Sequence, residues 1–149
     1  MIALPTLGVV AQAVARAARR FPLLLACALV AATAGILLVN SSEDEPYVRL
    51  LAAATLGLPL LFALTLTGER RFALGDARRW VLQGTGVVVL VAFWIVWPSW
   101  PESVQVARYF ELSVSFHLLA AFLPYALVDE QNGFWQYNKA LFMRFLMAG

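Results

Sequence analysis

The sequence predicts an all-α integral membrane protein, a bundle of about four transmembrane helices with an interfacial helix at each end. Three observations predict it. Hydrophobic residues make up 62% of the 149 residues, charged residues make up only 13%, and the hydrophobic residues gather in long runs. Soluble domains carry about 25% charged residues, which help to cover the core with a polar surface. This chain has too few for that, so lipid is the expected solvent.

The N-terminal segment, residues 1–20, is predicted to form a basic amphipathic helix. At about 100° per residue its hydrophobic side chains share one face. Arg16, Arg19 and Arg20 lie on the other face. A helix of this kind lies in the membrane interface, with its arginines among anionic headgroups, rather than across the bilayer.

Four apolar runs follow within residues 21–128, and each is long enough to cross the hydrocarbon core. They cover residues 21–39, 48–67, 80–97 and 106–128. The first run is about 28 Å long at roughly 1.5 Å per residue, close to the core thickness of roughly 30 Å. A secretory signal peptide cleaved at Ala32-Thr33-Ala34 is an alternative for it, but the run is long for that role.

The remaining runs are less regular. Pro59 lies inside the second run and predicts a kink. The third run is rich in valine, but its length and its lack of alternation favour a helix over a strand. Residues 129–149 are predicted to form a turn and an aromatic interfacial helix.

Charge sets the expected orientation, because lysine and arginine concentrate in cytoplasmic loops. Nine basic residues fall on one side of the four predicted spans: Arg16, Arg19, Arg20, Arg70, Arg71, Arg78, Arg79, Lys139 and Arg144. Only Arg49 and Arg108 fall on the other side. Both chain ends are therefore expected in the cytoplasm. Tyrosine and tryptophan residues near the predicted boundaries agree with this frame.

A candidate intramembrane polar site consists of Arg108, Glu111 and His117 in the fourth run and Gln83 in the third. A charge at the bilayer centre costs about 2.5–3.5 kcal/mol, so Glu111 is expected to reach the interface or to pair with Arg108. His117 lies deeper and could relay protons. The alternative is a neutral histidine bonded to a neighbouring helix. Glu111 and His117 lie about 120° apart around a helix, so they do not form a ready-made site.

No pattern in the sequence predicts an enzyme, a metal site or a cofactor. The one histidine allows no Ser-His-Asp arrangement, and Cys27 stands alone in an apolar run. No cluster matches zinc, haem or iron–sulfur ligation. The basic residues sit at the ends of apolar runs rather than on a polar face, which excludes the nucleic-acid-binding class.

Small residues in the apolar runs predict close helix packing. Gln83-Gly84-Thr85-Gly86 lacks the full glycine fingerprint of a nucleotide site, so helix contact is its expected role. The pairs Ala31/Gly35 and Ala53/Gly57 have the small-x-x-x-small spacing that lets helices approach each other.

The C-terminal segment carries the most distinctive motif, N-G-F-W-Q-Y-N-K over residues 132–139, followed by Leu141-Phe142 and Arg144-Phe145-Leu146. It resembles the N-G-F-W-Q-[FY]-N-K-x-L-F-x-R-F-L signature of a bacterial family of multi-pass inner-membrane proteins that carry a domain of unknown function. The resemblance implies a bacterial inner-membrane location and brings no activity with it. Family members continue into further spans, so a short or truncated member is expected.

The two ends of the chain form a candidate interface for lipids or partner proteins. Its residues are Arg16, Arg19, Arg20, Asn132, Trp135, Gln136, Asn138, Lys139 and Arg144. Tryptophan anchors helices at the membrane boundary, and basic side chains bind lipid phosphates. The polar amides among so many aromatics also suggest a specific hydrogen-bonding surface.

The leading hypothesis is a non-enzymatic accessory or structural subunit of a larger bacterial inner-membrane complex, with membrane lipids and other membrane subunits as partners. One alternative is a transporter or channel component that uses Pro59, Glu111 and His117. Another is a membrane sensor or regulator that acts through the two terminal segments.

Overall fold

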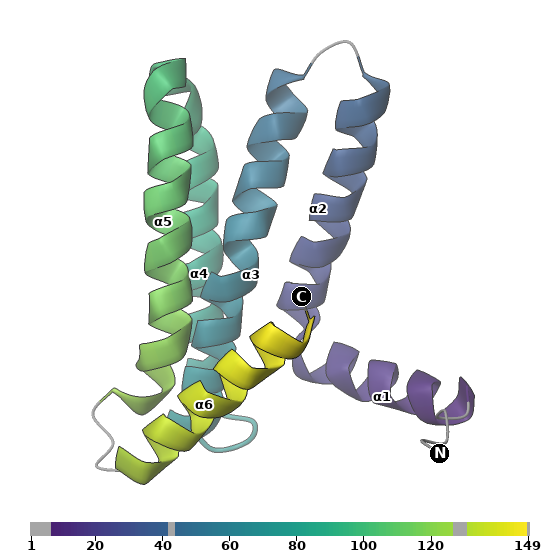
Figure 1. Cartoon of the computed structure of the whole chain (residues 1–149), viewed down its shortest axis with the longest axis vertical. Coiled ribbons are helices and arrows are strands. Elements are labelled where there is room, and N and C mark those ends of the chain that lie inside the picture. The colour runs from purple at the N-terminus through teal and green to yellow at the C-terminus, as the bar shows by residue number, and fades with distance from the viewer. Residues whose placement is uncertain (1–6, 42–43, 127–130, 149) are drawn as a thin grey trace.

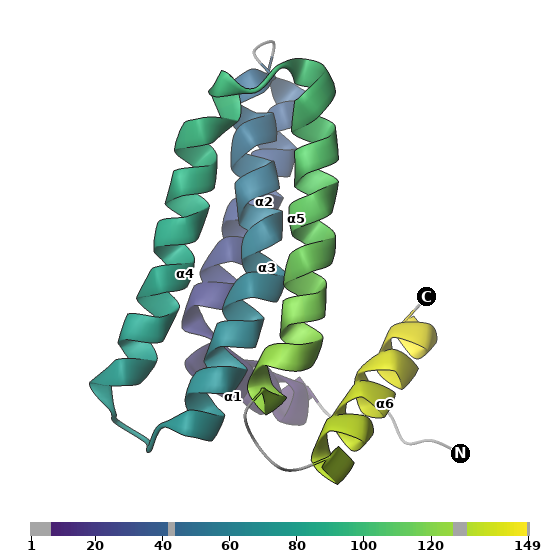
Figure 2. The same cartoon turned by 90° about the vertical axis from the view of Figure 1, so that its left-hand side faces the viewer.

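The computed structural model describes residues 7–41, 44–126 and 131–148, and every regular element among them is a helix (Figure 1). The elements are α1 (Leu7–Arg20), α2 (Pro22–Asn40), α3 (Glu45–Arg71), α4 (Ala77–Val96), η1 (Trp97–Ser99), α5 (Glu102–Phe122), η2 (Leu123–Tyr125) and α6 (Gln131–Ala148). Helices α2 to α5 stand side by side, whereas α1 and α6 cross the bundle axis at one end (Figures 1 and 2). The predicted all-helical fold is confirmed.

Four of these helices are long and apolar enough to cross a membrane, as predicted. They are α2, α3, α4 continued by η1, and α5 continued by η2, with mean hydropathies from 1.3 to 2.5. Helix α3 is longer than the predicted run 48–67. Pro46 is tolerated in its first turn, and Glu45 and Arg71 complement the helix dipole at its two ends. Helix α5 begins at Glu102, before the predicted start of the fourth run.

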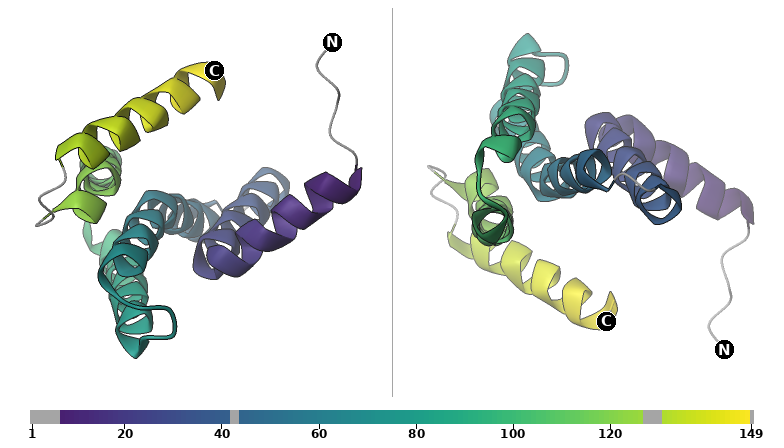
Figure 3. Two further views of the ribbon diagram at one scale, coloured as in Figure 1. Left: turned by 90° about the horizontal axis from the view of Figure 1, so that it is seen from below. Right: turned by 90° about the horizontal axis from the view of Figure 1, so that it is seen from above.

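Helix α3 is the centre of the bundle. Viewed along the bundle axis, α2 lies on one side of α3 while α4 and α5 lie on the other (Figure 3). In the apolar stretch of α3 67% of the residues are buried, against 22% for α4 and 6% each for α2 and α5. The outer helices therefore pack on α3 and leave most of their own surface uncovered.

Small residues let the neighbouring helices approach α3. An added Cβ on Gly57 would lie 2.8 Å from Cys27 Sγ of α2 and 3.0 Å from Leu90 Cδ1 of α4. An added Cβ on Gly86 of α4 would lie 2.6 Å from Leu64 Cδ1 of α3. The predicted close packing is thus confirmed for these two glycines. Gly84 and Gly35 have open space around their Cβ positions, so they make no such contact.

Threonine hydroxyls in the apolar centre of the bundle donate hydrogen bonds to backbone carbonyls of their own helix. Thr65 and Thr67, both buried in α3, each donate to the carbonyl four residues earlier at 2.7 Å. Thr55 donates to the Leu51 carbonyl at 2.8 Å, and its oxygen lies 3.1 Å from the Tyr109 hydroxyl of α5. Because each hydroxyl has an acceptor, these side chains can be buried without the cost of an unpaired polar group.

An aromatic cluster closes the end of the bundle away from α1 and α6. Phe93 and Trp97 meet edge to face with ring centroids 5.3 Å apart, and Trp100 lies 6.0 Å from Phe93. The cluster packs on Ala52 and Leu56 of α3, and Tyr109 of α5 lies against it. It holds the η1 connection between α4 and α5 close to the central helix.

Candidate functional site

One end of the bundle, here called the basic end, gathers most of the cationic side chains. It comprises α1, α6 and the connection between α3 and α4, which lie together at the lower end of Figure 1. Its described cations are Arg16, Arg19, Arg20, Arg70, Arg71, Arg78, Arg79 and Lys139. Glu45 and Glu102 begin helices at the opposite end. The chain therefore brings together the basic residues that the sequence assigns to one side.

An ion pair fixes α1 to the end of α3. Arg20 Nε donates to Glu69 Oε1 at 2.9 Å, and Arg20 Nη2 donates to Glu69 Oε2 at 2.6 Å. This two-point contact matches the planar guanidinium to the carboxylate. The hydrogen bond to Glu69, opposed by partial burial and assisted by the charge of Glu69, raises the pKa of Arg20. The sequence pattern did not single out this pair, because 49 residues separate its members.

Glu69→Gln is expected to loosen α1 while leaving the bundle almost as stable as before. The two side chains are 56% and 26% exposed, so solvent screening limits the loss of unfolding free energy to about 1 kcal/mol or less. Tryptic cleavage after Arg20 should accelerate about threefold when α1 detaches. Glu102→Gln, at the start of α5, is the control. Equal cleavage rates in the two variants would mean that Glu69 does not hold α1.

A second set of contacts holds α5, η2 and α6 to the basic end. Arg70 Nη2 donates to the Tyr125 hydroxyl at 2.9 Å, and its guanidinium lies 3.9 Å from the centroid of that ring. Arg71 Nη2 donates to the Ala126 carbonyl at 2.7 Å. From α6, Tyr137 donates to the Ala120 carbonyl at 3.2 Å. Burial, and then the nearby Tyr125, raise the pKa of Tyr137 despite an opposing effect of Arg70.

The C-terminal motif divides into a docked face and a free face. Asn138 Nδ2 donates to the Phe134 carbonyl at 3.0 Å, while Phe134 itself packs edge to face on Tyr125. Trp135, Gln136 and Lys139 are exposed. The free face remains a predicted interface for lipids or partners, and the side chains of Asn132 and Arg144 lie outside the described residues.

The predicted ion pair of α5 forms. Arg108 Nη1 donates to Glu111 Oε2 at 2.9 Å, with side-chain exposures of 55% and 61%. Because α5 begins at Glu102, Glu111 lies about 14 Å along the helix from its first residue. The ion pair therefore lies further from the start of the helix than a start at residue 106 would place it. No described part of the chain covers this surface.

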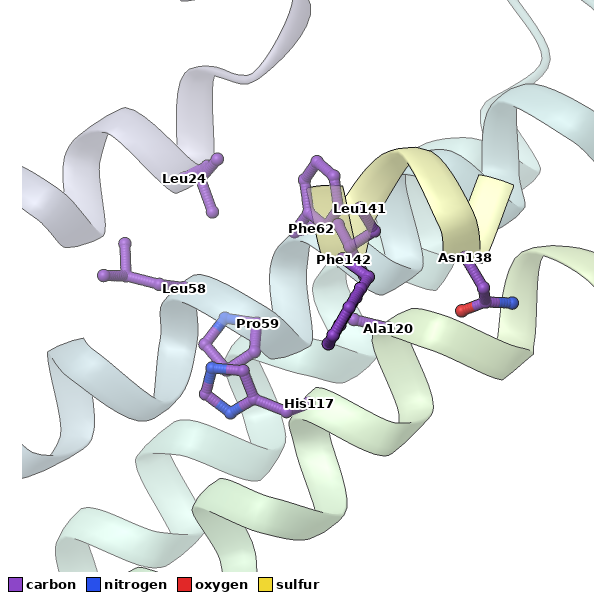
Figure 4. Close-up of a pocket in the computed structure, with 9 residues that line it drawn as sticks. All are labelled: Leu24, Leu58, Pro59, Phe62, His117, Ala120, Asn138, Leu141 and Phe142. Carbon is purple, nitrogen blue, oxygen red and sulfur yellow. The ribbon is translucent and has the colours of Figure 1, made fainter. Parts of the chain in front are cut away.

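His117 lies in an open groove of about 860 Å³ between α2, α3, α5 and α6 (Figure 4). Its ring lies beside Pro59, while Asn138 lies at the other end of the groove. The predicted bond to a neighbouring helix is wrong: His117 Nδ1 donates to the Ser113 carbonyl of its own helix at 2.7 Å. The Ser113 carbonyl lies about one helical turn before His117, so the ring reaches it without a partner from another helix. Apolar side chains form most of the remaining wall.

Gln83 lies apart from the other members of the candidate polar site. Its Nε2 donates to Thr65 Oγ1 at 3.2 Å, between α4 and α3 near the basic end. Of the four residues of the candidate polar site, Arg108 therefore pairs with Glu111, His117 lies beside Pro59, and Gln83 bonds to Thr65. A signal for the last pair was available, because Thr65 and Gln83 both lie near the ends of adjacent apolar runs that face the basic residues 70–79.

No protein-family model, curated protein or solved structure gives a significant match to the chain.

Proposed function

We propose that the chain is a non-enzymatic accessory or structural subunit of a larger bacterial inner-membrane complex. The observation that carries the proposal is the exposed ion pair on α5. Ionisable groups within membrane spans almost always face a bundle interior or a water-filled cavity, because exposure to acyl chains costs free energy. Arg108 and Glu111 are instead more than half exposed. A helix of a partner subunit laid on α5 would give this pair the interior position that it lacks.

The amount of uncovered surface supports the same proposal. The chain exposes 10,660 Å², whereas a compact chain of 16.4 kDa exposes about 7,500 Å². A specific interface needs about 800 Å² from each partner. The excess is large enough for several such interfaces.

Helix α5 offers a regular face for a partner helix. Large apolar side chains recur along it at intervals of four residues: Val106, Phe110, Val114, Leu118 and Phe122, each 58–64% exposed. Residues four apart form a ridge along a helix, and such ridges fit the grooves of a neighbouring helix. The stripe runs the length of the span, beside the ion pair.

Photocrosslinking in native membranes tests the proposal. A photoreactive phenylalanine analogue at Val114 is expected to give one protein adduct of fixed mass, which mild detergent extraction should recover at fixed stoichiometry. Glu111→Gln should weaken copurification about tenfold, because it leaves Arg108 without its partner. Glu102→Gln is the control. A homogeneous lone monomer with only lipid adducts at Val114 would contradict the proposal. An adduct of twice the chain mass would also contradict it, because the partner would then be a second copy of this chain and not a different subunit.

A transporter component is the second candidate, favoured by the position of His117 beside Pro59 (Figure 4). Transport sites combine ionisable groups with irregular helix backbone. Pro59 removes one backbone hydrogen bond from α3, although α3 continues unbroken past it. Glu111 is not among the described residues that line this groove, and the polar ones among them are His117 and Asn138. If His117→Ala leaves the flux into proteoliposomes unchanged, this candidate loses its basis.

A further inference from the structure

An apolar groove runs along α3 between α2 and α4. We call it the α2–α4 groove and define it by Leu23 and Cys27 of α2, Ala53 and Leu61 of α3, and Val87 and Trp94 of α4. Its volume is about 390 Å³. From Leu50 to Leu61 it extends about 16 Å along α3, roughly half of the hydrocarbon core. The groove therefore has the length of one membrane leaflet.

A polar cavity of about 330 Å³ continues the line of the groove at the basic end. We call it the headgroup pocket. The same three helices line both. Toward the basic end, Pro22 is next to Leu23 on α2, Thr65 lies one turn beyond Leu61 on α3, and Gln83 lies one turn beyond Val87 on α4. An amphiphilic ligand whose polar group occupies the headgroup pocket would therefore extend its apolar chain into the α2–α4 groove.

The charges in the headgroup pocket suit a zwitterion. Three guanidinium groups and two carboxylates line it: Arg19, Arg20, Arg79, Glu69 and Asp76. Arg20 and Glu69 satisfy each other. Arg79 Nε donates to the Gly68 carbonyl at 3.3 Å, and its two Nη groups stay available for a ligand. Arg19 has no partner in the described part of the chain. Asp76 Oδ1 accepts from the Arg78 backbone N–H, which leaves Oδ2 available.

An unpaired acceptor points to a ligand with N–H donors. Thr65 gives its hydroxyl proton to the Leu61 carbonyl at 2.7 Å, so its oxygen accepts from Gln83 Nε2. Gln83 Oε1 is consequently left buried without a donor among the described residues. A buried carbonyl oxygen without a donor is destabilising, and terminal amide torsions turn easily. The Gln83 side chain also lines the headgroup pocket, so rotation of its terminal amide, which gives up the bond from Nε2 to Thr65, would turn Oε1 toward a donor placed there.

We infer that this site binds one phospholipid with a primary-amine headgroup from the leaflet at the basic end. Arg19 and Arg79 hold the phosphate, Asp76 and Gln83 Oε1 accept from the ammonium group, and one acyl chain fills the α2–α4 groove. Guanidinium groups bind phosphate in two-point contacts, and an ammonium group offers three donors. A headgroup without N–H or O–H donors would leave the amide oxygen and Asp76 Oδ2 unpaired, and only an ammonium group also brings a positive charge to Asp76.

Native mass spectrometry of the full chain, with equal amounts of phosphatidylethanolamine, phosphatidylglycerol and phosphatidylcholine, tests the inference. One phosphatidylethanolamine per chain should be retained about tenfold better than phosphatidylcholine, which has the same net charge but no N–H donors. Gln83→Leu should weaken this preference while binding persists, because only Asp76 then accepts from the ammonium group. Retention that is equal for the three lipids, or highest for phosphatidylglycerol, would overturn the inference.

Matched variants separate the phosphate contacts and the groove from general effects on folding. Arg79→Gln should lower retention about tenfold, whereas Arg78→Gln, one residue away and outside the pocket, should not change it. Ala26→Trp should fill the groove and expel the lipid, whereas Ala28→Trp, outside the groove, should not. Equal retention within either pair would overturn the inference. Displacement of the lipid by millimolar inorganic phosphate alone would also overturn it, because a free anion would then be the ligand.

Discussion

Gly86→Leu is expected to lower the unfolding free energy of the bundle by about 2–3 kcal/mol. The first side-chain carbon would already lie 2.6 Å from Leu64 Cδ1 and 2.9 Å from Leu61 Cδ2. Both leucines are buried, so neither has free space into which to move. The added side chain must therefore push α4 away from α3. Unfolding by increasing sodium dodecyl sulfate in mixed micelles, followed by circular dichroism, measures the loss.

Gly84→Leu is the matched control for Gly86→Leu. Gly84 lies two residues earlier on the same helix, and no heavy atom lies within 4 Å of its Cβ position. Leucine is a better helix former than glycine, so this variant should be as stable as the wild type or slightly more stable. Equal destabilisation by the two substitutions would show that helix propensity, rather than the contact between α4 and α3, sets the result.

Gly57→Leu is expected to destabilise the bundle by a similar amount, because Gly57 faces two helices at once. Its Cβ position lies 2.8 Å from Cys27 Sγ and 3.0 Å from Leu90 Cδ1. The new side chain would separate α2 and α4 from α3, with an expected loss of about 2–3 kcal/mol in the same detergent titration. Gly35→Leu, the other small-x-x-x-small glycine, should change the stability by less than about 0.5 kcal/mol, because its Cβ position is open.

A double-mutant cycle isolates the contact between Gly57 and Cys27. Cys27→Ala removes the sulfur atom that a Cβ on residue 57 would meet. Gly57→Ala should therefore cost less in the Cys27→Ala background than in the wild type, with a coupling of at least about 0.5 kcal/mol. Additive effects would show that the two helices are not in contact at this point.

The sequence predicts the four helices well, because their apolar length is a property of each segment alone. It did not indicate which helix lies at the centre. Hydropathy is misleading here: α2 has the highest mean hydropathy, 2.5, and yet is mostly uncovered, while the central α3 has 2.0. Small residues do not mark the central helix either, because α2 has six alanines and glycines among its 19 residues and α3 has six among its 27. Which helix lies at the centre depends on contacts among all four helices, which no single segment encodes.

Contacts within one helix could be predicted, and contacts between helices could not. Arg108 and Glu111 are three residues apart, so helical geometry alone brings them together. Arg20 with Glu69, and Thr65 with Gln83, depend on how the helices are rotated about their axes, which the packing of many side chains decides. Grouping Gln83 with Glu111 and His117 on polarity alone joined residues that have separate partners: Gln83 bonds to Thr65, Glu111 to Arg108 and His117 to Ser113.

Single-cysteine labelling tests the central claim, that four crossings around α3 bring α1, α6 and the α3–α4 connection to one side of the membrane. In a Cys27→Ala background, intact cells are treated with a membrane-impermeant maleimide. Asp44→Cys and Glu102→Cys are expected to react from outside, whereas Arg78→Cys and Lys139→Cys should react only after permeabilisation. Reaction of Arg78→Cys and Lys139→Cys from opposite sides, or of Arg78→Cys and Glu102→Cys from the same side, would contradict the arrangement of the spans.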